Sequence, residues 1–206
     1  MKFDRIEAPV AFSMVDHLDH PTQQPTCVFA RYACCWMAFN NIYFVALRGK
    51  LATNPKYCQD RKPHEMPSEK CHLTFIASQI VPGVLQQVIE SPSFEFFLTR
   101  RPTSLHGNVP DIQGVPPNGV TNIARSIYAN VPKVSGLDRT IAGRVGTKNQ
   151  LATDEGAVAA ELVMMLYTIR NNMFHGGKEF DDPNANEVLR EAYVILRNIV
   201  DSFLAT

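Results

Sequence analysis

The feature that most constrains the fold is the segment 27–48, in which large apolar side chains recur every three or four residues. These side chains are Phe29, Tyr32, Trp36, Phe39, Tyr43 and Leu47. The spacing predicts a long helix that buries one face, and Thr26 is a suitable N-cap for it. No segment shows the alternation of apolar and polar residues that a half-buried strand needs. The sequence therefore predicts an all-α protein.

The same kind of spacing predicts further helices along the chain. They cover residues 69–90, 94–100, 119–131, 154–175 and 185–204, and Pro82-Gly83 should kink or divide the first of them. The remaining segments, 1–26, 49–68, 101–119 and 132–153, are predicted to be irregular. We therefore expect a single domain over residues 1–206. Its core helices are 27–48, 69–90, 155–175 and 185–204, and the first, third and fourth of these should form an antiparallel bundle with long loops.

The composition excludes some classes of protein. The chain has 206 residues, is 45% apolar and carries no formal net charge, which indicates a globular protein and argues against a strongly basic nucleic-acid coat protein. It leaves room for an RNA-cutting enzyme with a local positive cleft. No apolar run is long enough to span a membrane, and the N-terminus has no hydrophobic signal core. The odd number of cysteines, with Cys34 and Cys35 adjacent, is typical of reduced thiols in a cytoplasmic protein.

Several common site motifs are absent from the sequence. It contains no GxxxxGKS/T phosphate loop, no GxGxxG turn after a strand and no GxSxG elbow. This argues against nucleotide hydrolysis, dinucleotide redox chemistry and serine-hydrolase chemistry. No common zinc-site spacing fits the available ligands, which are His17, His20, Cys58, His64, Cys71 and His72. We expect no metal and no other cofactor.

The densest group of chemically active side chains lies at the end of the predicted helix 154–175. Residues 170–178 read Arg-Asn-Asn-Met-Phe-His-Gly-Gly-Lys. Arg170 has the planar fork that holds a phosphate by two parallel hydrogen bonds, and His175 is able to move a proton near neutral pH. Together with the amides, they form a minimal set for cutting a phosphodiester that carries its own nucleophile.

Helical geometry relates the members of this group. Asn171 and His175 are four residues apart and share one face, whereas Phe174 falls toward the apolar side. His175 lies in the last turn, where the carbonyl end of the helix favours a protonated imidazole, and the two glycines that follow end the helix. The alternative is that Arg170 is a solvated helix residue and His175 a cap without chemistry.

This pattern resembles the HEPN superfamily. Its hallmark is R-x4–6-H near the end of an apolar helix, with a polar residue directly after the arginine, and Arg170, Asn171 and His175 stand in these places. The wider string 166–178 is similar to bacterial members linked to toxin–antitoxin and phage-defence loci. Residues 29–43 resemble the first long helix of such proteins, and 187–204 resemble the helix after the motif. Gly177 departs from the members that a partner nucleotidyltransferase modifies, which usually carry a tyrosine there.

The resemblance implies a metal-independent endoribonuclease that acts as a homodimer, although some members are inactive and only bind. Arg170, Asn171 and His175 are the expected catalytic residues. The expected RNA contacts are Lys178, Asn172, Asn40 and Asn41. Asn40 and Asn41 are included because their helix should pack on the motif helix; the alternative is a buried amide satisfied by a neighbour.

The expected reaction is attack by the RNA 2′-hydroxyl on the adjacent phosphorus, with His175 moving a proton and Arg170 stabilising the charge. Five basic residues form a segment that would guide RNA phosphates to the cleft, and the alternative is a solvated loop. They are Arg125, Lys133, Arg139, Arg144 and Lys148. Surplus apolar surface for a dimer contact is expected on Trp36, Tyr43, Met164 and Tyr167. Expected partners are RNA, a second copy and an antitoxin or other regulator. The competing class is an inactive RNA- or nucleotide-binding or regulatory module.

Overall fold

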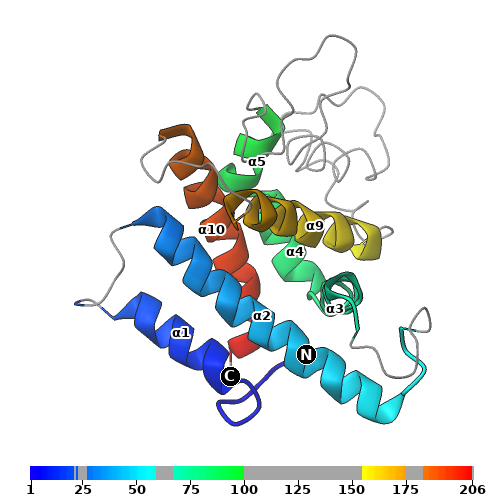
Figure 1. Cartoon of the computed structure of the whole chain (residues 1–206). Helices are drawn as coiled ribbons and strands as arrows, with labels where there is room; N and C mark the ends of the chain where they lie inside the picture. The colour runs from blue at the N-terminus through cyan, green and yellow to red at the C-terminus, as the bar shows by residue number, and fades with distance from the viewer. Residues whose placement is uncertain (21, 23–26, 59–66, 100–154, 175–182, 206) are drawn as a thin grey trace, which may run out of the picture.

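The computed structural model describes residues 1–20, 22, 27–58, 67–99, 155–174 and 183–205 (Figure 1). Its helices are α1 (Pro9–Asp19), α2 (Val28–Thr53), α3 (Glu69–Ala77), α4 (Pro82–Ile89), α5 (Pro92–Thr99), α9 (Glu155–Phe174) and α10 (Pro183–Leu204). The regular secondary structure of these residues is entirely α-helical, which confirms the all-α prediction. Within the same ranges, no helix is long and apolar enough to cross a membrane.

α2 is the central helix and packs against α1, α3 and α10 (Figure 1). Its predicted apolar face is buried, with Tyr32, Phe39 and Leu47 fully covered and Trp36 and Tyr43 nearly so. Burying side chains of this size stabilises the folded state by roughly 1.5–3 kcal/mol each. The apolar spacing of this one segment therefore organises the core, which is continuous with the buried faces of the other helices.

α1 is the main departure from the predicted secondary structure, because residues 1–26 are predicted to be irregular. The helix begins at Pro9, whose fixed φ suits a first helical position. Its N-cap, Ala8, has no side-chain acceptor, and the cap comes instead from α2. The Oδ1 of Asn41 accepts a hydrogen bond from the Ala11 N–H at 3.3 Å. A helix that is capped by a distant residue leaves little signal in its own sequence.

The other helix boundaries agree with the predictions to within a few residues. α2 continues past residue 48 to Thr53, because Gly49 costs only about 1 kcal/mol in a helix, and its N-cap is Cys27 rather than Thr26. A break at Pro82 divides the predicted helix 69–90 into α3 and α4. The predicted helix 119–131 and the predicted caps of α9, Thr153 and Asp154, lie outside the described residues.

α2 and α10, the first and last of the three helices predicted to form an antiparallel bundle, run in the same direction, as they would in an up-down-up arrangement. Arg31 near the start of α2 lies over the ring of Tyr193, 4.6 Å from its centre. One turn further along α2, Cys35 lies near Arg197, one turn further along α10. Both helices begin at the upper left of Figure 1. α1 lies beside α2 and runs in the opposite direction (Figure 1).

The cysteines also differ from the expectation of reduced thiols. Cys58, just after α2, and Cys71 in α3 form a disulfide, which links two helices that pack against each other. Cys27, Cys34 and Cys35 are free. Burial raises the pKa of the Cys35 thiol, which keeps it protonated and unreactive.

Candidate functional site

α9 is held against α2 by a layer of large side chains, and this contact fixes the position of the motif. Trp36 and Tyr167 have ring centroids 6.3 Å apart, and the hydroxyl of Tyr32 donates a hydrogen bond to the Leu166 carbonyl at 2.8 Å. At the end of α9, the ring of Phe174 meets Phe29 edge-on at 6.1 Å. The last turns of α9, which carry Arg170–Phe174, therefore pack against α2.

Arg170 is held in a polar cluster formed by α2, α3 and α9. Its Nη1 donates a hydrogen bond to the Oδ1 of Asn171 at 2.8 Å and lies 3.8 Å from the Oε2 of Glu69. The guanidinium also packs over the ring of Phe174, 5.4 Å from its centre. The side chain is 27% exposed, so one edge of this cation remains accessible to solvent.

Glu69 connects Arg170 to a buried phenol. The hydroxyl of Tyr43 donates a hydrogen bond to the Oε1 of Glu69 at 2.8 Å. Burial raises the pKa of Tyr43 above its ordinary value, and the bond to Glu69 and the charge of Glu69 raise it further, while the positive charge of Arg170 opposes this shift. Glu69 is placed by the start of α3, where Ser68 caps the helix through the Cys71 N–H and the helix dipole favours a carboxylate.

Two donors of this region stand out because they have no acceptor. Within the described residues, the Nε of Arg170 and the indole N–H of Trp36 are buried without a hydrogen-bond partner. A buried donor without an acceptor costs roughly 1–3 kcal/mol.

The structure places the predicted site residues as follows. Asn171 contacts Arg170 directly, and Asn172 is half-buried on the same helix. Asn41 is bonded to α1 rather than to the motif, whereas Asn40 is half-buried one turn after Trp36. Two of the predicted residues, His175 and Lys178, lie outside the described residues, as does the basic segment 125–148.

Two further expectations about this region are corrected. Phe174 is 52% exposed rather than on the apolar side, because it packs on Arg170 and Phe29 at the edge of the core. Trp36 and Tyr43 are buried within the monomer, so they offer no surface for a dimer contact. Met164 and Tyr167 are half-buried.

Sequence reasoning missed Glu69 and the polar role of Tyr43. Tyr43 follows the apolar spacing of α2, so the sequence predicts an apolar role for its ring and gives no signal for its hydroxyl. Glu69 follows a capping serine, which is a local signal for a helix start. No local pattern connects it to Arg170, about a hundred residues later in the chain. Only the packing of α3 between α2 and α9 brings the three side chains together.

The side chains considered for zinc have other surroundings. His20 contacts the hydroxyl of Thr22 at 2.8 Å, His72 is buried and stacks on Phe44 at 4.9 Å, and Cys71 is in the disulfide. In the described part of the chain, no group of three or more His, Cys, Asp or Glu side chains is arranged to hold a metal ion. Among known proteins, no family model, no protein of curated function and no solved structure matches the chain.

Proposed function

We propose that this protein is a HEPN-like, metal-independent endoribonuclease of the toxin or antiviral-defence kind, and that it acts in the cytoplasm. The observation that carries the proposal is the state of Arg170. It is a half-buried cation at the end of α9, oriented by Asn171, with a buried Nε that lacks an acceptor in the described structure. His175 follows the last described residue of that helix directly.

The proposed reaction is an internal phosphoryl transfer. The 2′-hydroxyl of the RNA loses a proton and attacks the adjacent phosphorus, and the bond to the 5′-oxygen of the next nucleotide breaks. The products are a 2′,3′-cyclic phosphate and a 5′-hydroxyl, so the nucleophile comes from the substrate and no metal is needed. His175 takes or gives the proton, and the exposed part of the Arg170 guanidinium binds the phosphate as negative charge builds up.

Glu69 defines the competing function. Its carboxylate lies 3.8 Å from Arg170 and partly neutralises the cation that the reaction requires. In a binding module without activity, this carboxylate would limit Arg170 to weak contact with RNA or a nucleotide. Catalysis is favoured over this alternative because a histidine five residues after the arginine serves no purpose in simple binding.

The test is incubation of the purified protein with total RNA in excess chelator, with His175→Ala alongside. We expect cleavage to continue in chelator, to leave cyclic phosphate ends and to stop in the variant. A single 2′-deoxy substitution at the cut site should block cutting there. Cutting of DNA, or equal cleavage by His175→Ala, would contradict the mechanism. RNA binding without cleavage would favour the binding module.

A homodimer is part of the proposal, because acid–base cleavage works best with one group to take a proton and another to give one, and each chain has one His175. Two-fold symmetry is the commonest oligomer geometry. Sedimentation at micromolar concentration should show a dimer. In mixed dimers of wild type and His175→Ala, activity should fall by more than the fraction of variant chains. A fully active monomer would refute a site that is shared between two chains.

A further inference from the structure

Phe174, the last described residue of α9, exposes about half of its surface to solvent. Its exposed fraction is 52%, although an edge contact with Phe29 at 6.1 Å holds the ring in place from the side of α2. Of the phenylalanines that the structure describes, only Phe44 is comparably exposed, and its ring is stacked on His72 at 4.9 Å. Phe174 is therefore an aromatic ring that is positioned by the fold and accessible to a ligand.

A partly free cation lies directly beside this ring. The guanidinium of Arg170 is 5.4 Å from the centre of the Phe174 ring, and the arginine side chain is 27% exposed. Asn171 holds the guanidinium at 2.8 Å, whereas the Glu69 carboxylate is 3.8 Å away. A nucleotide carries a charged phosphate and a flat aromatic base a short distance apart. An accessible cation next to an accessible ring offers a partner to each of these two groups.

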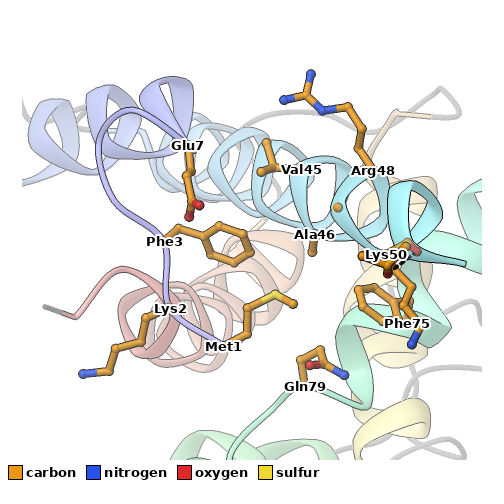
Figure 2. Close-up of a pocket in the computed structure, with 12 residues that line it drawn as sticks. Met1, Lys2, Phe3, Glu7, Val45, Ala46, Arg48, Lys50, Phe75 and Gln79 are labelled. Carbon is orange, nitrogen blue, oxygen red and sulfur yellow. Dashed lines mark hydrogen bonds between the residues drawn. The ribbon is translucent and has the colours of Figure 1, made fainter.

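A pocket elsewhere in the molecule lacks this combination. It has a volume of about 560 Å³ and lies between the N-terminal segment, the last turns of α2 and α3 (Figure 2). Figure 2 shows that Lys2 and Arg48 point away from the aromatic rings of the pocket. These rings, Phe3 and Phe75, are almost fully buried. A phosphate held by either cation would have no aromatic face beside it, so the end of α9 is the better place for a nucleotide.

We propose that Phe174 binds an unpaired base of the RNA by stacking, while Arg170 holds a neighbouring phosphate. The inference rests on the proposed RNA cleavage and extends that site from the phosphate to the base. Every base has a π face, so stacking on a phenylalanine ring tolerates any base. In a duplex the bases are stacked on one another and paired, which leaves no face free for a protein ring. Phe174 thus selects for unpaired bases rather than for a sequence.

The test is fluorescence anisotropy of the full chain with a labelled 2′-O-methyl oligoadenylate, about eight nucleotides long. The proposed reaction does not cut this probe, because its 2′-oxygen is blocked. Two further probes carry the same number of phosphates: the same chain without bases, and the duplex of the oligoadenylate with its complement. Wild type should bind the single strand roughly fivefold or more tightly than either of them. Equal affinity for the chain with and without bases would overturn the proposal.

Variants of the exposed rings separate stacking from a structural role. Phe174→Leu should weaken binding of the oligoadenylate by roughly fivefold or more and leave binding of the chain without bases unchanged. Phe174→Trp keeps an aromatic face and should retain the preference for bases. Phe44→Leu and Arg48→Met are the controls, and each should bind all three probes as wild type does. Circular dichroism checks that each variant is folded.

The outcomes distinguish this inference from the proposed cleavage. If wild type cuts total RNA and Phe174→Leu keeps the preference for bases, the stacking site is wrong and the cleavage proposal stands. If the preference for bases depends on Phe174 but wild type cuts no RNA, the stacking site is correct and the protein is a binding module. A protein that neither binds the probes nor cuts RNA would refute both.

Discussion

Arg170 and Arg197 are similar in burial but very different in their partners. Their side chains are 27% and 18% exposed. Arg197 donates from Nε to both carboxylate oxygens of Asp201 at 2.7 and 2.8 Å, and from Nη1 and Nη2 to Asp19 at 3.0 and 2.8 Å. Arg170 has one amide at 2.8 Å, one carboxylate at 3.8 Å and a buried Nε without an acceptor in the described structure.

The difference separates an arginine that serves the fold from one that is available to a ligand. Arg197 joins the end of α1 to α10, and its hydrogen bonds compensate for the desolvation of its charge. Arg170 loses solvation without full compensation, so it makes a smaller contribution to stability. We infer that the α3–α9 region, rather than the α1–α10 region, is the better candidate for a site, and the following predictions test this contrast.

The largest expected effect is on activity. Arg170→Met should lower RNA cleavage by roughly a hundredfold or more, the usual loss when one group that stabilises a transition-state charge is removed. Arg197→Met should leave the activity of the folded fraction close to that of wild type. The measurement is the rate of cleavage per folded molecule, with folding checked by circular dichroism. Equal losses of cleavage activity in the two variants would contradict the proposed difference in role between these arginines.

Removal of the disulfide should have the next largest effect. It should destabilise the region of α3 and leave α1 unaffected. Cys58→Ser or Cys71→Ser opens a loop of 13 residues, which should lower the free energy of unfolding by about 3 kcal/mol. Hydrogen exchange should become faster in α3, around Glu69, and remain unchanged in α1. Thiol titration of the unreduced, denatured chain should find only Cys27, Cys34 and Cys35. A count that also includes Cys58 and Cys71 would contradict the pairing.

The stability of the two arginine variants should follow the opposite order to their activity. Arg197→Met should lower the free energy of unfolding by about 1–2 kcal/mol, a figure reduced for screening because Asp19 and Asp201 are half exposed. Arg170→Met should change it by less than about 0.5 kcal/mol, since the loss of weak contacts is offset by removal of a buried donor. Urea denaturation measures both. A larger loss for Arg170→Met would make it the structural arginine.

The sequence predicts the parts of this molecule that depend on local spacing, and misses the parts that depend on contacts between distant segments. The apolar face of α2 and the break at Pro82 follow from periodicity and from proline chemistry. α1 is not predicted from the sequence because its cap is the distant Asn41. The role of Glu69 is not predicted for the same reason, since its contact with Arg170 forms only when α3 and α9 pack together.

The smallest expected effect concerns alkaline pH and Tyr43. Burial, with the hydrogen bond and charge of Glu69, raises the pKa of this phenol above its ordinary value of 10.0. A group whose pKa is higher in the folded chain than in the unfolded chain contributes fully to stability below the pKa of the unfolded chain. This contribution is lost as pH rises past that pKa, because the unfolded chain then releases a proton that the folded chain keeps. Stability should therefore fall above about pH 10.

Tyr43→Phe removes this group, so its stability should decline less steeply with pH than that of wild type. At neutral pH the variant should be less stable by about 1 kcal/mol, through the lost bond to Glu69. At pH 10.5 the deficit should shrink by less than about 1 kcal/mol. Arg197→Met, in which no phenol is removed, should show nearly the same deficit at both pH values. Urea denaturation at pH 7 and 10.5 measures all three proteins. If the stability of wild type and of Tyr43→Phe declined in parallel with pH, Tyr43 would ionise as freely in the folded chain as in the unfolded one. The polar cluster formed by α2, α3 and α9 would then be open to solvent.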